Sequence, residues 1–328
     1  MNQQPHEIVW TMTNAALVSR CLHVMAEVGV ADLIAEEPVS VEELARKCAA
    51  DPDALDRSLR LLAAHGIFRD SGGAYEHTAA SRLLRSDHPM SMRAFPRMMG
   101  LPVFWTSFGA LEHSIRTGSP ALEQVAPQGL WPYLQDHPGE AEVFGAAMTA
   151  KAAGDTAAVL GAYDFSGFGT IADVGGGRGH LLRAVLDAAP DAAGVLFDLP
   201  HVIDAFALPA SRITTHAGDF FVDPLPAADA YLLMDVIHDW ADAEAVAILG
   251  AVRRAAPPGA RVLIIEAVAS DGQPDPHVQT LDIIMLAITG GRERTASRFA
   301  KLLDSAGLRL STVVETPGPL RIVEATAA

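Results

Sequence analysis

After residue 170, short apolar segments of strand length alternate regularly with helical segments. Strands are expected at residues 170–174, 195–198, 213–216, 230–235, 261–267, 308–315 and 320–324. Helices are expected between the first five strands, near residues 181–189, 202–207 and 243–256. This alternation predicts parallel strands joined by right-handed crossovers, that is, a doubly wound, Rossmann-like α/β sheet of seven strands. Only a short turn separates the last two segments, so we expect the last strand to pair antiparallel.

Residues 1–100 lack this alternation and are expected to form a separate, mainly helical domain. Apolar residues recur at helical spacing before Gly29, which favours a helix that ends there. Ser40 and Glu43 have the spacing of a capping box, and Asp53 is expected to cap the next helix. A hairpin is expected around residues 70–73. Helices followed by a hairpin are the order of a winged-helix module.

The rest of the chain, residues 101–328, is expected to form one larger domain. Its first part, residues 101–160, is helical in pattern and rich in aromatic and methionine side chains. Such side chains usually belong to a core, and each of them taken alone fits that role.

Charge and cysteine content exclude several classes of protein. A formal net charge of −16 opposes binding to a phosphate backbone, so no nucleic-acid partner is expected. Cys21 and Cys48 lack the spacing of metal ligands, and so few cysteines do not make a disulfide framework. The first ten residues show no signal-peptide pattern, and no apolar stretch is long enough for a membrane span. We therefore expect a cytoplasmic protein with no membrane segment.

A glycine-rich segment lies where the first strand of the sheet meets a helix. It reads Asp-Val-Gly-Gly-Gly-Arg-Gly over residues 173–179 and is followed by His180. Glycines there allow positive φ angles and let a ligand lie against the backbone. A dinucleotide site would need glycine at position 180. The observed pattern instead suits a nucleoside ligand without a pyrophosphate, such as S-adenosylmethionine, although a tight structural turn is an alternative.

Acidic and aromatic residues follow the next two strands. Asp198 ends the second strand, where a carboxylate can accept both ribose hydroxyls. Asp219 and Phe220 follow the third strand, where they could hold an adenine amino group and stack on the ring. Asp198 could also cap the turn before Pro200, and Phe220 could be core. With the glycine segment, they place ligand contacts at the carboxyl ends of three successive strands, where open α/β sheets bind ligands.

Three more polar residues are expected near this edge of the sheet. His238 follows the fourth strand and should lie beside the glycine segment, although a lone histidine is more often structural. Glu266 ends the fifth strand, where burial of a carboxylate costs free energy unless it has a partner. Glu293 lies within Gly-Gly-Arg-Glu-Arg-Thr, residues 290–295, and by itself could be a solvated loop charge.

Together these segments resemble the family shared by plant caffeate- and flavonoid-type O-methyltransferases and bacterial polyketide and antibiotic O-methyltransferases. The matching stretches are residues 173–179, 197–203, 218–221, 238–240 and 290–295. They occur in the family's order and at similar spacing across roughly residues 10 to 325. The combination is specific, although no single stretch is.

The resemblance implies metal-free methyl transfer from S-adenosylmethionine to a hydroxyl of a small aromatic secondary metabolite. His238 matches the family's general base, and Glu266 and Glu293 match two acidic residues that flank and orient its imidazole. The cofactor-binding residues implied are Asp173, Gly175, Gly177, Asp198, Leu199, Asp219 and Phe220. The implied substrate-pocket residues are Trp105, Phe144, Met148, Asp239, Met285 and Ile288. The family's winged-helix part is a dimerisation module, so a homodimer is expected.

Simple acid–base chemistry supports these roles. An imidazole of normal pKa, about 6.5, cannot fully ionise a phenol of pKa near 10, so proton transfer should accompany the attack of the oxygen. A carboxylate beside His238 would fix its tautomer and stabilise the imidazolium that forms.

One departure from the family and two other functions stay open. Plant members usually have a lysine that contacts the cofactor four residues before the base, whereas this chain has Met234, so the anchor for the cofactor's amino-acid end is unassigned. One other function is hydroxylation or decarboxylation by the same fold. The second is a winged-helix regulator with a ligand-sensing domain, which the acidic charge opposes.

Overall fold

A computed structural model gives the structure of the chain and describes residues 4–204 and 212–327. The chain divides into two compact units, residues 1–105 with 139–151 and residues 106–138 with 152–328. The long helix α10 (Pro138–Ala162) contributes to both units, and so does α7 (Pro102–Gly109). The units are defined by internal contacts, so the expected functional domains, 1–100 and 101–328, stay a prediction.

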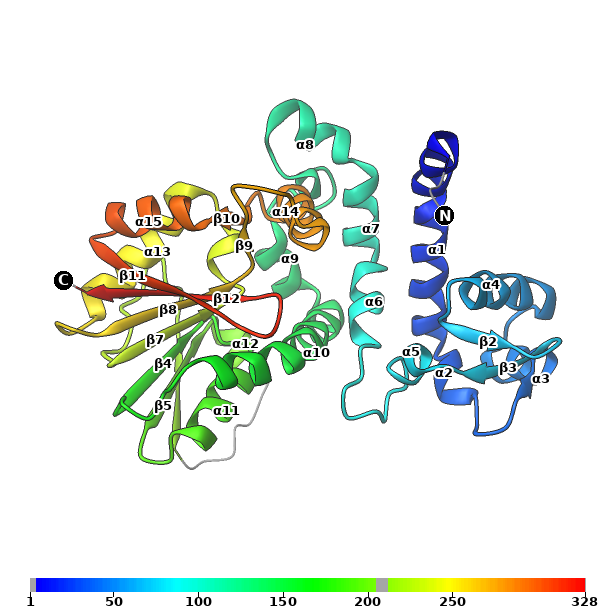
Figure 1. Cartoon of the computed structure of the whole chain (residues 1–328), viewed down its shortest axis with the longest axis horizontal. Helices are drawn as coiled ribbons and strands as arrows, with labels where there is room; N and C mark the ends of the chain where they lie inside the picture. The colour runs from blue at the N-terminus through cyan, green and yellow to red at the C-terminus, as the bar shows by residue number, and fades with distance from the viewer. Residues whose placement is uncertain (1–3, 205–211, 328) are drawn as a thin grey trace. The chain divides into compact units, whose positions relative to one another are not determined.

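The first unit is mainly helical (Figure 1). It also has a small antiparallel sheet in the order β1-β3-β2. Its helices, apart from parts of α7 and α10, are α1 (Pro5–Val28), α2 (Val30–Leu33), α3 (Val41–Cys48), α4 (Pro52–Ala64), α5 (Ala79–Arg82) and α6 (Ala94–Met99). Its strands are β1 (Val39–Ser40), β2 (Phe68–Asp70) and β3 (Ala74–His77). The predicted hairpin is therefore present, and β1 adds a third strand to it.

Helix ends in the first unit show which sequence signals act. α1 ends at Gly29, which takes the left-handed conformation with φ 73°, as predicted. Ser40 caps α3 and accepts a hydrogen bond from the Glu43 amide, also as predicted. The cap of α4 is Asp51 rather than Asp53, because Pro52 occupies the first helical position and Asp51 accepts from the Ala54 amide.

The second unit contains the predicted seven-stranded sheet, in the order β11-β12-β8-β7-β4-β5-β6. The strands are β4 (Thr170–Val174), β5 (Ala193–Asp198), β6 (Ile213–Ala217), β7 (Ala230–Met234), β8 (Arg261–Glu266), β11 (Leu308–Glu315) and β12 (Arg321–Ala327). Strands β4 to β8 pair parallel, and β12 pairs antiparallel with both β8 and β11. The expected fold class is thus confirmed.

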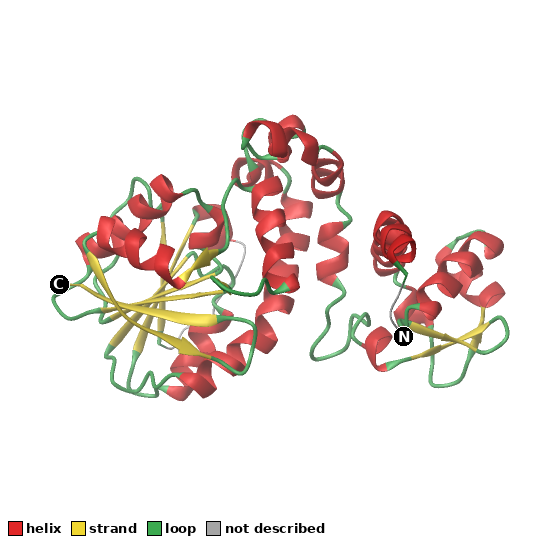
Figure 2. Ribbon diagram, turned by 45° about the horizontal axis from the view of Figure 1, so that its top comes forward, coloured by secondary structure: helices red, strands yellow, loops and turns green. Residues whose placement is uncertain are grey.

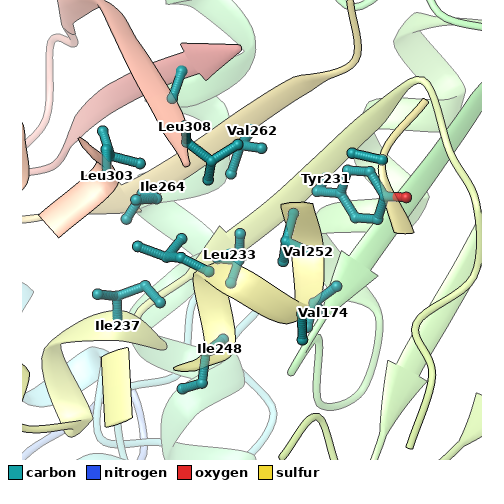
Figure 3. Packing of buried hydrophobic residues seen from close by; sticks show 14 of the residues in the cluster. Val174, Tyr231, Leu233, Ile237, Ile248, Val252, Val262, Ile264, Leu303 and Leu308 are labelled. Carbon is teal, nitrogen blue, oxygen red and sulfur yellow. The ribbon is translucent and has the colours of Figure 1, made fainter. Parts of the chain in front are cut away.

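Helices cover both faces of this sheet (Figure 2). On one face, α13 (Asp242–Ala255) and α15 (Ala296–Ser305) pack against the strands in the cluster shown in Figure 3. On the other face lie α11 (His180–Ala188), the end of α10 and α14 (Pro276–Ile288). The helix predicted at 202–207 is α12 (Pro200–Asp204), and the rest of that prediction falls outside the described residues.

Short elements complete the second unit. They are α8 (Leu111–Thr117), η1 (Ala121–Gln124), α9 (Leu130–Asp136), η2 (Ile237–Asp239), β9 (Val268–Ala269) and β10 (Arg294–Thr295). β9 and β10 form a small parallel pair that the sequence pattern did not predict. Among residues 4–204 and 212–327, no helix combines the length and apolar character needed to cross a membrane.

The order of the strands determines where a site can form. The chain runs from β4 outward to β5 and β6, then returns to the other side of β4 as β7 and β8. The connections from β4 and from β7 therefore leave the sheet in opposite directions at neighbouring carboxyl ends. Such a switch point opens a crevice in doubly wound sheets, and it lies between the glycine segment and the residues after β7.

Candidate active site

The glycine segment after β4 adopts a backbone that side chains would obstruct. Gly175 and Gly177 have φ angles of 70° and 55°, in the left-handed region that favours glycine. A Cβ on Gly176 would lie 2.5 Å from the Asp173 carboxyl, and one on Gly175 would lie 3.0 Å from the Val236 side chain. For a Cβ placed on Gly177, no atom of the described residues outside its chain neighbours lies within 4 Å. The loop thus packs closely against Asp173 and Val236 and leaves space beside Gly177.

Asp198 fastens this loop to the end of β5. Its carboxylate oxygens accept hydrogen bonds from the Gly177 and Leu199 amides, each at 2.7 Å. Burial raises the pKa of Asp198, while these two amides oppose the increase. A carboxylate oxygen can accept more than one hydrogen bond, so Asp198 keeps acceptor capacity for hydroxyls of a ligand. The residues at this loop therefore fit a nucleoside.

Asp173 lies beneath the loop and is 2% exposed. Burial, together with the charge of Asp198, raises its pKa to about 7. Its carboxyl contacts the underside of Gly176, so we expect it to act on a ligand through the loop rather than by direct contact.

Asp219 and Phe220 follow β6, as the sequence predicted. Asp219 Oδ1 accepts the Phe221 amide at 2.9 Å, and the Asp219 amide donates to Asp223 at 2.8 Å. The rings of Phe220 and Trp240 are nearly perpendicular, with centroids 5.8 Å apart. Because Trp240 follows β7, this aromatic contact joins the loops after two strands of the same sheet edge.

His238 lies in η2, immediately after β7, and is 6% exposed. Its Nδ1 lies 2.8 Å from Glu293 Oε1, and its Nε2 lies 3.9 Å from Asp239 Oδ1. A carboxylate can only accept, so Nδ1 carries a proton and, in the neutral ring, Nε2 keeps a free lone pair. The imidazole is therefore arranged to take up a proton at Nε2.

The pKa of His238 differs from the normal value assumed above. Burial by itself lowers it, but the hydrogen bond to Glu293 and the charges of Asp239, Glu266 and Asp235 outweigh burial and raise the pKa to about 10. The expectation of a normal imidazole is therefore wrong. A phenol also has a pKa of about 10, and such matching favours transfer of a proton between the two groups.

Glu266 has a different task from the one expected. Its Oε1 accepts the amides of Val236, Ile237 and His238, at 3.1, 2.5 and 3.0 Å. Glu293 thus binds the imidazole, whereas Glu266 binds the main chain of the turn that carries it. Burial raises the pKa of Glu266 to about 7, with the His238 charge lowering it and the Glu293 charge raising it.

Two further residues shape this turn, and the sequence pattern does not predict either of these roles. A Cβ on Gly291 would lie 1.9 Å from the His238 carbonyl oxygen, so only glycine fits there. Arg294 is 1% exposed and donates to the carbonyls of Ile237 and Trp240 at 2.9 and 2.7 Å. Residues 292–294 read Arg-Glu-Arg, a run that looks like a solvated loop, so the sequence carries no signal for their burial.

The expected substrate-pocket residues are divided between the two units. In the first unit, Phe144 stacks on Phe104 with centroids 6.4 Å apart, and the Trp105 ring meets His23 edge-on; Met148 lies on the same helix as Phe144. In the second unit are Asp239 beside the base, and Met285 and Ile288 on α14, which are 8% and 3% exposed. The pocket itself stays a prediction.

Comparison with known proteins gives independent information. The sequence model described as the O-methyltransferase domain matches residues 108–309, and the one described as the O-methyltransferase dimerisation domain matches residues 10–87. The phenazine O-methyltransferase of Lysobacter antibioticus is 38% identical, with 97% of this chain and 95% of that protein covered. The mitomycin biosynthesis 6-O-methyltransferase of Streptomyces lavendulae is 36% identical, with 97% and 93% covered.

A solved structure extends this similarity to three dimensions. It is an O-methyltransferase from neocarzinostatin biosynthesis, in complex with S-adenosylmethionine and 2-hydroxy-5-methyl naphthoic acid. It superposes with a TM-score of 0.79 at 36% identity, with 94% of this chain and 96% of that chain covered. The chain therefore belongs to the family of S-adenosylmethionine-dependent O-methyltransferases, and it is an enzyme of that family.

Proposed function

We propose that the enzyme methylates a hydroxyl of a small aromatic molecule, with His238 as the general base and without a metal ion. The observation that carries this proposal is the buried pair of His238 and Glu293, at the same sheet edge as the glycine loop. In the described part of the chain, no three His, Cys, Asp or Glu side chains are grouped so that they could hold a metal ion.

The residues after β4, β5 and β6 would hold the cofactor. S-adenosylmethionine, when bound, supplies a methyl group on a positively charged sulfur. We assign the ribose hydroxyls to Asp198, the adenine to Asp219 and Phe220, and close backbone contacts to the loop containing Gly175 and Gly177. Leu199 would line the same site, and Asp173 would support the loop from below. The anchor of the amino-acid end stays unassigned.

The base acts on the acceptor hydroxyl. Nε2 of His238 takes up the proton of the acceptor hydroxyl, and the imidazolium that forms is stabilised by Glu293 at Nδ1 and by Asp239 near Nε2. Burial of the pair keeps competing water away from the proton transfer. The remaining task of the site is to hold the acceptor oxygen in the right direction for the reaction.

The relatives' names indicate the acceptor class and the assembly. The two curated relatives are named for a phenazine and for mitomycin biosynthesis, which supports an aromatic acceptor from secondary metabolism for this enzyme. We propose that Asp239, Met285 and Ile288 of the second unit line its pocket; the same role for Trp105, Phe144 and Met148 stays an expectation from the family resemblance. The match to the dimerisation domain supports a homodimer. We also propose a cytoplasmic location with no nucleic-acid partner.

A mass-shift assay tests the proposal. The enzyme is incubated with S-adenosylmethionine, excess chelator and a panel of aromatic hydroxyl compounds that includes hydroxyphenazines and 1,4-dihydroxy-2-naphthoic acid. We expect one acceptor to gain the mass of one methylene group at an undiminished rate. Loss of methylation on chelation would contradict the metal-free claim. Gain of an oxygen or loss of carbon dioxide would instead identify hydroxylation or decarboxylation.

A further inference from the structure

Arg294 directly follows Glu293 and lies in β10, with only 1% of its surface exposed. A buried guanidinium costs free energy unless its charge is paired and its N–H groups are bonded. Its Nη1 donates to the Ile237 carbonyl at 2.9 Å, and its Nη2 donates to the Trp240 carbonyl at 2.7 Å. Nε and Nη2 both donate to Asp242 Oδ1, at 3.0 and 2.9 Å.

These partners belong to the turn that carries the base. Ile237 directly precedes His238, Trp240 lies two residues after it, and Asp242 begins α13. The planar guanidinium therefore binds the turn on both sides of the base from two different nitrogens, a fixed spacing of donors that an ammonium group does not have. Asp242 supplies the opposite charge, although its side chain is 62% exposed.

Glu266 holds the same turn from its amide side. Its Oε1 accepts the amides of three successive residues that end with His238, while Arg294 donates to carbonyls of the turn. The buried carboxyl group of Glu266 thus binds N–H groups of this turn, and the buried guanidinium of Arg294 binds its carbonyl groups. Ile237, fully buried in the cluster of Figure 3, fixes the turn from the core side.

The segment that carries Arg294 also carries the partner of the imidazole. The Arg292 amide donates to the His238 carbonyl at 2.8 Å, and Glu293 binds Nδ1 of the ring. Of the three successive residues 292 to 294, the first binds the carbonyl of His238, the second binds its ring, and the third binds the carbonyls of Ile237 and Trp240. A shift of η2 relative to residues 292–294 would turn Nε2 of His238 away from the acceptor hydroxyl.

We propose that Arg294 is a positioning residue, which locks η2 to residues 292–294 and so sets the direction of Nε2 of His238. This inference rests on the proposed role of His238 as the base, because Arg294 acts through that imidazole. It differs from a purely structural role, in which loss of Arg294 would weaken folding and cofactor binding together.

Two substitutions separate these roles. Arg294→Lys keeps the charge but offers one nitrogen for two carbonyls, and Arg294→Met keeps the length but has no donor. We expect kcat to fall about 10- to 100-fold, the loss associated with a displacement of about 1 Å in a catalytic group. The affinity for S-adenosylhomocysteine, measured by calorimetry, should be unchanged. Arg298→Lys, at an exposed position on α15, is the matched control and should retain full kcat.

Two further measurements separate positioning from folding. The Nδ1 proton of His238 should give a low-field NMR signal in the wild type that broadens or moves in Arg294→Lys, and this readout needs no acceptor. Because Arg294 acts through His238, Arg294→Lys combined with His238→Gln should be no slower than His238→Gln alone.

Several results would overturn the inference. One is a wild-type kcat in Arg294→Lys. Another is a fall of kcat in this variant that is accompanied by equal falls in cofactor affinity and melting temperature. The third is a double variant in which the losses of kcat from Arg294→Lys and His238→Gln add up in full. Failure of the proposed function looks different, because His238→Gln itself would then be as active as the wild type. If His238→Gln is slow while Arg294→Lys is fast, only the present inference fails.

Discussion

At the residue scale, carboxylates set the properties of the imidazole. His238 is buried, and burial alone would favour the neutral ring, yet Glu293 at 2.8 Å and the nearby Asp239 reverse that preference. A single imidazole without these neighbours would be a weaker base and would be free to change tautomer. The sequence could suggest Glu293 through family resemblance only, since its burial depends on a loop whose charges alternate in sign.

The raised pKa predicts an alkaline pH profile. Only the neutral imidazole can accept a proton, so kcat/KM should rise with pH above 7 as His238 loses its proton. The positive charge of bound S-adenosylmethionine would lower the pH at the midpoint of this rise. Glu293→Gln removes the negative charge that stabilises the imidazolium. We therefore expect its profile to shift to lower pH and its maximal rate to fall. A midpoint that stays in place or rises in Glu293→Gln would show that Glu293 does not set the pKa.

Asp198 provides a test of the cofactor site. Asp198→Asn keeps the size of the side chain but removes its charge, and we expect the binding of S-adenosylhomocysteine to weaken by about 1.5–3 kcal/mol. Asp229→Asn is the matched control, because Asp229 also accepts two backbone amides, those of Gly169 and Thr170, but at the amino end of β4. Calorimetry measures the affinity of both variants for S-adenosylhomocysteine. If the two variants bind it equally well, Asp198 only stabilises the turn.

At the scale of elements, the strands were predictable and the loops between them were not. An apolar run such as 261–267 can be recognised because a strand buried on both faces needs it, and β8 ends within one residue of that expectation. The contacts of η2 with β10 join residues more than fifty positions apart, and no local pattern encodes them. The positions of candidate residues on the sheet edge were therefore predictable, but the separate tasks of Glu266 and Glu293 were not.

Gly291 shows how closely two such elements approach. Gly291→Ala places a methyl group against the His238 carbonyl, and we expect a loss of about 1–3 kcal/mol in the free energy of unfolding together with lower turnover. In Gly250→Ala, within α13, the new methyl group lies 3.5 Å from the end of the Arg254 side chain, and we expect this variant instead to be stabilised by about 0.5–1 kcal/mol. Urea unfolding measures both, and a neutral effect of Gly291→Ala would contradict the close approach.

At the scale of the whole molecule, the architecture of the second unit followed from the alternation of strands and helices, because right-handed crossovers leave few other arrangements. For the first unit, the sequence predicted mainly where helices begin and end and where the hairpin turns. Its helix α1 leaves large apolar side chains exposed, among them Ile8, Val9, Trp10, Met12 and Leu17. An isolated chain would expose this surface to water, which favours its burial against a second copy.

The homodimer can be tested on this helix. We expect light scattering at micromolar concentration to give twice the mass of one chain, and Trp10→Glu, which places a charge at a 73% exposed apolar position of α1, to shift the protein towards the monomer. Val222→Glu, at a position 78% exposed in the second unit, should leave the mass unchanged. A monomeric mass for the wild type would refute the dimer.

If His238 removes the proton from the acceptor hydroxyl, variants of His238 should lose turnover and keep their affinity for the cofactor. His238→Gln retains an N–H for Glu293 but cannot take the proton, and His238→Ala removes the ring. Both should bind S-adenosylhomocysteine as the wild type does, because none of the assigned ribose or adenine contacts involves His238. We predict that turnover falls roughly 10²–10⁴-fold in both variants. If both bind the cofactor normally and still methylate at near wild-type rates, His238 is structural and is not the general base.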